Sequence, residues 1–350
     1  MARQPGVWVL LGGAAGGNGQ LRALAGALGW PFQTRQLVHG PLQRIPNPLL
    51  GASLLGLDRR RSDPLEPPWP DLVLAAGRRS APVSLWIRAR SGGRARLVHL
   101  LHAQAPLERF DLVVTLPQYR LPRRENVLEL TGALNRPAPA ELEAAAARWR
   151  PRFGALPRPW IALVVGGDSS SYRLDADTAR RLGREACAEA RAAGGSLLVT
   201  TTPRTGDEAG RALQGALDAP HHAYCFRRDD PENPYRAYLA LADRFIVTVD
   251  SASLPMEACA TGRPVQVFEW PRRGGARPLA PLAGWRRRLA ARGWYKPARD
   301  FDAYHRALRE RGLTTRLGEG PPRRPPAPPD DLGRAAARVS ALLGASGDSL

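Results

Sequence analysis

Short apolar runs alternate with longer amphipathic or alanine-rich stretches along most of the chain. Apolar runs of this length are typical of strands buried on both faces, and helical stretches between them indicate a parallel α/β sheet. In the first part of the chain the pattern predicts strands at residues 7–11, 71–76, 96–101, 111–115 and 127–130, a glycine-rich turn at 12–19, and helices at 20–28, 82–90 and 138–149.

The pattern restarts after a proline- and arginine-rich segment, residues 150–159, which has the composition of a domain linker. The second part predicts strands at 160–165, 196–200, 222–226, 245–249 and 265–269, and helices at 175–193, 208–217, 233–242 and 254–261. Each part opens with a strand, a glycine loop and a helix, so we expect an α/β protein with two Rossmann-like domains facing each other across a cleft. The expected divisions are an N-terminal domain (1–149), a linker (150–159), a C-terminal domain with a basic tail (160–320), and a proline-rich segment with a closing helix (321–350).

The chain has a large excess of basic over acidic residues. The 350 residues contain 51 Lys and Arg against 32 Asp and Glu, which gives a formal net charge of +19. Residues 271–324 contribute +11 of that charge and also contain Trp285, Trp294, Tyr295 and Phe301. An excess of this kind predicts an anionic partner. Nucleic acid is disfavoured because no nucleic-acid-binding motif accompanies the cluster. An anionic membrane surface and a merely solvated arginine-rich surface both stay open.

The spacing of the cysteines and the length of the apolar runs indicate the cellular compartment of the protein. The three cysteines lie far apart and form no CxxC pair, so neither a disulfide framework nor a zinc site is indicated. No apolar run approaches the roughly 20 residues of a membrane helix. We therefore expect a cytoplasmic protein, with a peripheral position on the inner membrane as one alternative.

Four loops follow predicted strands, at the edge where α/β sheets bind ligands. The first lacks the spacing of a dinucleotide or P-loop motif, so it is either a ligand loop or a tight turn. The other three contain hydroxyl groups, glycines and one arginine that could hold phosphate, but each also suits a turn or a helix cap. In the fourth loop the carboxylate of Glu257 lies one helical turn beyond Ser253, where it could accept hydrogen bonds from two sugar hydroxyls. The residues concerned are Gly12, Gly13, Gly16, Gly17, Asn18 and Gln20; Gly166, Gly167, Asp168, Ser169 and Ser170; Thr201 and Arg204; and Asp250, Ser251, Ser253 and Glu257.

These loops resemble the nucleotide-sugar site of GT-B glycosyltransferases. More specifically, four segments are similar to the mitochondrial fission protein family first named for plant elongated mitochondria, which has many bacterial members. They are residues 232–235, 240–243, 247–253 and 257–265. The resemblance implies a GT-B-like fold, with the diphosphate near residues 166–170 and 251–253, the ribose at Glu257, and an acceptor on the side of residues 12–20.

The chain departs from that family at two places. Gly12-Gly13 and Gly17-Asn18 stand where the family has Asp-Gly and His, and Gln118-Tyr119-Arg120 follows Pro117 where the family often has His-Asp. Weak candidates for a catalytic base are His99 and His102, each more simply explained as a structural histidine. They could also suggest an HxxH metal site, but no third ligand is evident, so no metal is expected.

Two hypotheses for function follow. The first is a metal-independent, glycosyltransferase-like protein that binds a nucleotide-sugar, or another phosphorylated ligand, at the cytoplasmic membrane face and uses no separate cofactor. The alternative is a non-catalytic adaptor that recruits a protein or membrane partner through its basic surface.

Overall fold

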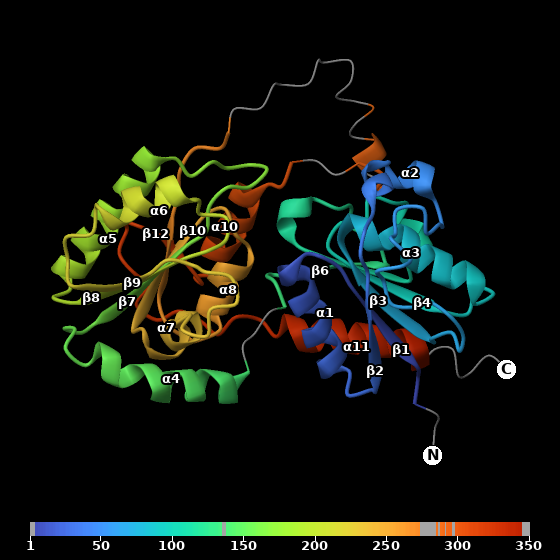
Figure 1. Cartoon of the computed structure of the whole chain (residues 1–350), viewed down its shortest axis with the longest axis horizontal. Coiled ribbons are helices and arrows are strands. Elements are labelled where there is room, and N and C mark those ends of the chain that lie inside the picture. The colour runs from blue at the N-terminus through green and yellow to red at the C-terminus, as the bar shows by residue number, and fades with distance from the viewer. Residues whose placement is uncertain are drawn as a thin grey trace. The chain divides into compact units, whose positions relative to one another are not determined.

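The computed structural model describes residues 4–134, 138–273, 285, 288–290, 292–295 and 298–344. The chain divides into two compact units and passes between them four times. The first unit comprises Met1–Asn135, Ala276–Asp300 and Asp330–Leu350, and the second comprises Arg136–Gly275 and Phe301–Pro329. Each unit is built on its own sheet, coloured mainly blue to cyan in the first and green to orange in the second (Figure 1).

The first unit contains a six-stranded parallel sheet with the strand order β2-β1-β3-β4-β5-β6. Its strands are β1 (Val7–Leu11), β2 (Phe32–Gln36), β3 (Leu72–Ala76), β4 (Arg96–Leu100), β5 (Leu112–Thr115) and β6 (Val127–Glu129). Its α-helices include α1 (Ala15–Ala27), α2 (Asn47–Leu50), α3 (Gly77–Arg90) and α11 (Asp331–Gly344).

The second unit repeats this architecture with the strand order β12-β11-β10-β7-β8-β9, again all parallel. Its strands are β7 (Trp160–Val165), β8 (Ser196–Thr201), β9 (His221–Tyr224), β10 (Arg244–Thr248), β11 (Val265–Phe268) and β12 (Thr315–Arg316). Its helices include α4 (Pro139–Phe153), α5 (Ala176–Ala192), α6 (Asp207–Gln214), α7 (Tyr235–Leu241), α8 (Ser253–Cys259) and α10 (Phe301–Glu310).

The two units divide the chain differently from the expected domains. Helix α4, expected in the N-terminal domain, belongs to the second unit, because Trp149 and Phe153 pack into its core. Residues 150–153 are helical as well, so part of the expected linker is not a linker. The closing helix α11 returns to the first unit and packs against α1.

Other differences follow from local composition. Strand β2 was not predicted from the sequence, because its residues FQTRQ are mostly polar and partly exposed, as an edge strand allows. Helix α1 begins at Ala15 rather than at residue 20, although Gly16 and Gly17 are poor helix formers. Within the described part of the chain, no helix combines the length and the apolar character needed to cross a membrane.

Candidate functional site

Three of the four loops singled out in the sequence meet at the carboxyl edge of the second sheet. They follow β7, β8 and β10, which are neighbours in the sheet. The order of the strands changes direction at this point, since β8 and β9 lie on one side of β7 and β10 to β12 on the other. Such a switch point is where open α/β sheets bind ligands. The remaining loop, residues 12–20, lies in the first unit.

The carboxylate of Asp250 joins these three loops. Its side chain is 0% exposed, and its Oδ2 lies 2.5 Å from Nη1 of Arg204 and accepts a hydrogen bond of 2.9 Å from the N–H of Gly167. Within the described residues its Oδ1 has no hydrogen-bond partner. A buried carboxylate that already pairs with an arginine repels a phosphate. These contacts therefore favour a structural role for Asp250 over the phosphate contact that we expected.

Glycine is required twice in the loop after β7. A Cβ on Gly166 would collide with the carboxylate of Asp250, and a Cβ on Gly167 would collide with the backbone carbonyl of Arg204. Two hydroxyl groups hold the same backbone in place. The N–H of Gly166 donates to Oγ1 of Thr248 (2.7 Å), and Oγ1 of Thr205 donates to the carbonyl of Gly166 (2.6 Å). The three loops can thus approach this closely only with glycine at positions 166 and 167.

Several of the expected phosphate-binding residues are engaged in the loops themselves. Asp168 accepts a hydrogen bond from the N–H of Leu174 (2.9 Å) and pairs with Arg273 (2.8 Å). Thr201 is buried, and its Oγ1 accepts a hydrogen bond from the N–H of Phe226 (2.9 Å). The Oγ of Ser169 accepts a hydrogen bond from the N–H of Tyr172 (3.1 Å) and closes a turn that leaves its neighbour Ser170 exposed.

The loop after β10 leads into α8 and to Glu257. Oγ of Ser251 accepts a hydrogen bond from the N–H of Leu254 (3.3 Å) and lies 3.4 Å from Oγ of Ser253. One turn further on, Oε2 of Glu257 accepts a hydrogen bond of 2.6 Å from the hydroxyl of Tyr235. Burial raises the pKa of Tyr235 well above its usual value, and the neighbouring carboxylate raises it further. The phenol therefore stays protonated and holds Glu257 in one orientation.

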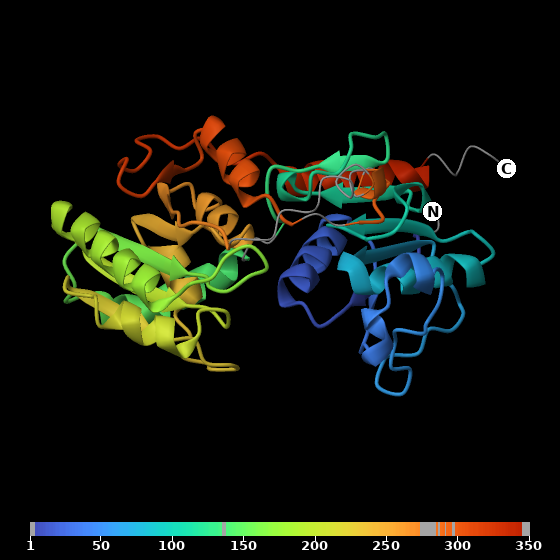
Figure 2. The ribbon, with the colours of Figure 1, turned by 90° about the horizontal axis from the view of Figure 1, so that it is seen from above.

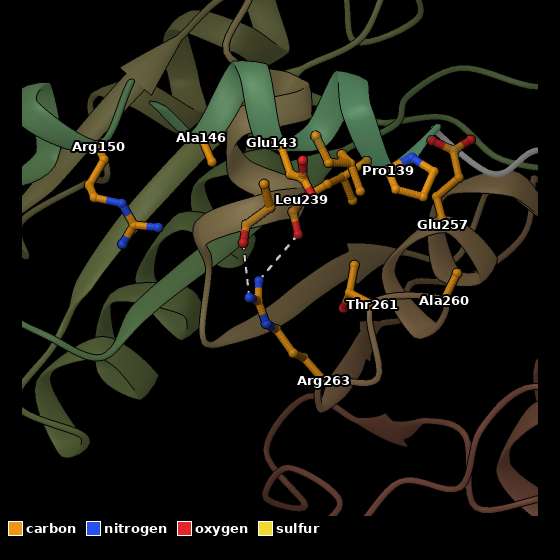
Figure 3. A pocket seen from close by; sticks show the side chains of 11 residues that line it. Pro139, Glu143, Ala146, Arg150, Leu239, Glu257, Ala260, Thr261 and Arg263 are labelled. Carbon is orange, nitrogen blue, oxygen red and sulfur yellow. Dashed lines mark hydrogen bonds between the residues drawn. The ribbon is translucent and has the colours of Figure 1, made fainter. Parts of the chain in front are cut away.

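Glu257 borders a pocket of about 590 Å³ between α4, α7 and α8 (Figure 3). Glu257 and Arg150 lie at opposite ends of this pocket. Near its floor, the guanidinium of Arg263 donates to the carbonyls of Leu239 (3.2 Å) and Ala240 (2.9 Å) at the end of α7. The remaining lining residues are Pro139, Leu142, Glu143, Ala146, Ala260 and Thr261.

Sequence reasoning missed this pocket. Five of its lining residues come from α4 and lie at least 113 residues before Arg263 in the chain. The sequence gives no local sign that α4 packs on α7. Tyr235 appeared in the sequence only as part of a family-like segment. Its role as the partner of Glu257 depends on the same long-range packing.

The two candidate histidines are buried, at 0% and 2% exposed for His99 and His102. Nε2 of His99 donates to the carbonyl of Gly77 (3.1 Å), and burial lowers the pKa of His99 to about 3. Nδ1 of His102 accepts a hydrogen bond from the N–H of Gln104 (3.1 Å). A general base must reach the proton that it removes. The burial of both rings therefore favours the structural alternative over a catalytic one.

The polar side chains of residues 12–20 form hydrogen bonds with the backbone of this segment and of Leu134. The side-chain amide of Asn18 exchanges two hydrogen bonds with the backbone of Gly12 (3.0 and 2.7 Å). Gln20 is buried, donates to the carbonyl of Gly16 (3.3 Å) and accepts from the N–H of Leu134 (3.3 Å). Gly13, Gly16 and Gly17 have no neighbouring atom closer than 3.6 Å to a Cβ built on them. The segment is thus a short loop followed by the first turns of α1, with open space beside its glycines.

The basic segment 271–324 is not one tail. Trp285, Trp294 and Tyr295 belong to the first unit, and residues 301–324 belong to the second. Phe301 is fully buried in the core of the second unit as part of α10. The aromatic residues of this segment therefore serve different purposes. Among the residues of the segment that the structure describes, the large apolar side chains with substantial exposure are Trp285 (61%) and Trp294 (39%). Part of the segment, including Lys296, lies outside the described residues.

Comparison with known proteins agrees with the architecture. The chain is 31% identical over 241 residues to the mitochondrial fission protein ELM1 of Arabidopsis thaliana, covering 63% of this chain and 56% of that relative, so it spans little more than half of the relative's length. It is 23% identical over 296 residues (75% of this chain, 82% of the relative) to the uncharacterized protein RP120 of Rickettsia prowazekii. A crystal structure from Listeria monocytogenes, assigned as a UDP-N-acetylglucosamine 2-epimerase, has a TM-score of 0.50 at 13% identity and covers 99% of this chain and 98% of its own.

The structural similarity and the two six-stranded parallel sheets confirm the predicted fold class of two Rossmann-like units in a GT-B-like protein. The sequence also matches the family described as mitochondrial fission ELM1 over residues 15–343, nearly the whole chain. This confirms the resemblance seen in the sequence. The chain belongs to the mitochondrial fission ELM1 family.

Proposed function

We propose that the second unit binds a nucleoside diphosphate sugar at the carboxyl edge of its sheet. The observation that carries the proposal is the placement of Glu257. Its carboxylate is oriented by the hydroxyl of Tyr235, borders a pocket of about 590 Å³, and follows the serine pair Ser251 and Ser253 by one helical turn. A helical turn rises about 5.4 Å, a span that a nucleotide bridges between its phosphate and its ribose hydroxyls.

In this proposal each group has a separate task. The carboxylate of Glu257 accepts hydrogen bonds from the ribose hydroxyls, and the nucleoside extends into the pocket beneath α4. The hydroxyl of Ser253, the exposed loop at Ser170 and the exposed part of Arg204 receive the diphosphate. Backbone N–H groups, hydroxyls and one guanidinium can stabilise such an anion without a metal ion.

The reaction that this arrangement would serve is transfer of the sugar to an acceptor, with the diphosphate as leaving group. The solved structure of similar fold is assigned to an enzyme that acts on a UDP-linked sugar, which is consistent with a ligand of this class. A location at the cytoplasmic face of a membrane is part of the same proposal.

A non-catalytic adaptor is the second candidate, and one observation favours it. At the place where the family often has His-Asp, Arg120 forms an ion pair with Asp300, and the carbonyl of Gln118 accepts a hydrogen bond from the N–H of Asp300 (2.9 Å). Residues that the family presents at this loop are thus replaced by a closed structural contact. An adaptor could retain the nucleotide site as a regulatory ligand site.

Isothermal titration of the full chain with UDP, GDP, ADP and CMP, each alone and linked to a sugar, tests the proposal. We expect one nucleotide class to bind with a stoichiometry of one. The variant Glu257→Gln should weaken that binding by about tenfold or more, because a hydrogen bond to a charged group contributes about 1.5–3 kcal/mol.

The matched control is Glu310→Gln, an exposed glutamate of α10 in the same unit that lines none of the described pockets. It should bind like the unaltered protein. Absence of binding by every nucleotide at millimolar concentration, or equal affinity of the Glu257→Gln variant, contradicts the proposal. Binding without turnover of the sugar linkage favours the adaptor.

A further inference from the structure

We infer that the first unit docks on an anionic phospholipid surface through a leucine loop, residues 40–56, assisted by the segment that contains Trp285 and Trp294. This surface adds the leucine loop, which lies far away in the chain, to part of the basic segment expected from the sequence. The inference is independent of the nucleotide site, which belongs to the second unit.

The leucine loop is closed at its base. His39 and Leu57 form an isolated β-bridge, and the N–H of Gly40 donates to the carbonyl of Gly56 (3.1 Å). Between these ends the chain forms the 3₁₀ turn Pro41–Arg44 and the short helix α2. A loop with joined ends that packs on its own side chains is a compact surface structure. Figure 2 shows this loop, in blue, at the rim of the first unit.

Polar contacts fasten the loop from below. Asn47 is 4% exposed and donates through Nδ2 to the carbonyls of Arg78 and Ala103, both at 2.7 Å. The guanidinium of Arg78 donates in turn to the carbonyls of Gln43 (2.5 Å) and Ile45 (3.1 Å). Asn47 thus fastens the loop to α3 and to the segment after β4, and Arg78 binds two carbonyl groups of the loop itself.

The leucines of this loop divide between the two sides. Leu50 is buried at 6% exposed and Leu54 is partly buried against the core, whereas Leu42, Leu49 and Leu55 are 50%, 78% and 63% exposed. Single exposed apolar residues are ordinary on protein surfaces, but three on one anchored loop are not. The loop therefore presents apolar side chains at a fixed position instead of burying them.

A second exposed apolar segment packs at the same edge of the sheet. The N–H of Leu107 donates to the carbonyl of Arg292 (3.3 Å). Gly293 has φ +79°, and a Cβ there would lie 2.7 Å from the carbonyl of Ala105, so the chain touches the loop after β4 at this point. Asn47 of the leucine loop contacts the same loop at Ala103. Figure 1 shows α2 and the turn at residues 288–290 at one end of the first unit.

The arginines around these exposed apolar residues indicate that the partner is an anionic lipid surface. Exposed arginines flank both segments: Arg44, Arg59, Arg60 and Arg61 beside the leucine loop, and Arg288 and Arg292 between the tryptophans. Leucine that inserts among acyl chains, tryptophan at headgroup depth and arginine facing anionic headgroups are the combination that binds proteins to the surface of a membrane. The formal net charge of +19 strengthens the attraction to anionic lipid.

Vesicle flotation of the full chain tests the inference, with phosphatidylcholine vesicles that contain or lack phosphatidylglycerol. The unaltered protein should float with the anionic vesicles only. The triple variant Leu42→Ser, Leu49→Ser and Leu55→Ser should partition at least about tenfold more weakly, because three apolar side chains no longer leave water. Phe32→Ser, which replaces a 38% exposed apolar residue of the same unit outside the loop, should float like the unaltered protein.

Circular dichroism establishes that each variant is folded, and Leu49→Ser alone, at the most exposed of the three positions, replaces the triple variant if that one does not fold. Flotation of the leucine variant equal to that of the unaltered protein overturns the inference. So does an unaltered protein that binds no vesicle. If the unaltered chain instead self-associates in sedimentation velocity and the leucine variant stays monomeric, the loop serves a second copy of the chain and the lipid assignment is wrong.

Discussion

The two units each have a six-stranded parallel sheet, and the carboxyl edges of the two sheets differ in chemistry. In the second unit the loops are joined by a buried ion pair between Asp250 and Arg204 and by glycines that leave no room for a Cβ. In the first unit the loop after β1 is held by the neutral amide of Asn18, and a neighbouring loop turns leucines outward. One edge is thus arranged for close approach of a polar ligand, the other for contact with an apolar surface.

This difference shows how little the fold alone determines. Both units have six parallel strands with the first strand of the unit inside the sheet, so their loops occur at comparable places. The few side chains that fill those loops decide what each edge can bind. The ligand that each edge binds therefore follows from these side chains rather than from the architecture that the two units share.

The largest expected effect separates the two glycine loops. Gly167→Ala should lower the free energy of unfolding of the second unit by about 3 kcal/mol, because its Cβ collides with the backbone carbonyl of Arg204. Gly13→Ala, in the corresponding loop of the first unit, meets no atom within 4 Å and should change it by less than about 0.5 kcal/mol. Urea denaturation followed by circular dichroism measures both. Equal changes in the free energy of unfolding for the two variants would contradict the difference in packing between the two loops.

The second prediction compares two ion pairs. Arg204→Ala leaves the carboxylate of Asp250, which is 0% exposed, without its cation and should destabilise the second unit by about 2–3 kcal/mol. This value is at the low end of the free-energy cost of removing one partner from a buried ion pair, because the side chain of Arg204 is itself 38% exposed. Arg120→Ala removes a 66% exposed guanidinium from Asp300 in the first unit and should cost less than about 1 kcal/mol. The same denaturation experiment at high and low salt distinguishes the two pairs.

The third prediction concerns pH and the first unit. The pKa of His99 is lowered to about 3 in the folded state, so the ring stays neutral there, whereas the unfolded chain takes up a proton below its ordinary pKa of 6.5. Stability from this group is complete above pH 6.5 and is lost as the pH falls toward 3, and at pH 5 the loss is about 2 kcal/mol. His99→Gln should therefore show a smaller decrease in stability between pH 7 and pH 5 than the unaltered protein. An unchanged decrease means that His99 is accessible to protons in the folded state.

The sequence predicts the strands well wherever they are buried on both faces. Val7–Leu11 and Trp160–Val165 were predicted with the bounds that the structure shows, since a continuous apolar run leaves little choice. Strand β2 and helix α10 were missed, the first because an edge strand can be polar, the second because its apolar residues alternate with arginines.

Within the candidate site, the sequence located the three loops but not their internal partners. Strand order brings the loops together. The alternation of strands and helices predicts that the strands are parallel, so that the loops lie at one edge of the sheet, but it does not give their order. The pairing of Asp250 with Arg204 and of Glu257 with Tyr235 depends on contacts between segments 22 to 46 residues apart, for which a single sequence carries no local signal. For the same reason the structural role of Asp250 and the pocket beneath α4 became apparent only in three dimensions.

A crystal structure determined after soaking with a mixture of uridine, guanosine, adenosine and cytidine diphosphates tests the central claim most directly. The account predicts density for one nucleotide, with its ribose at Glu257, its base in the pocket lined by α4, and its phosphates beside Ser253 and the loop at Ser170. Density for a nucleotide elsewhere in the protein, or an empty pocket at saturating concentration, would contradict it.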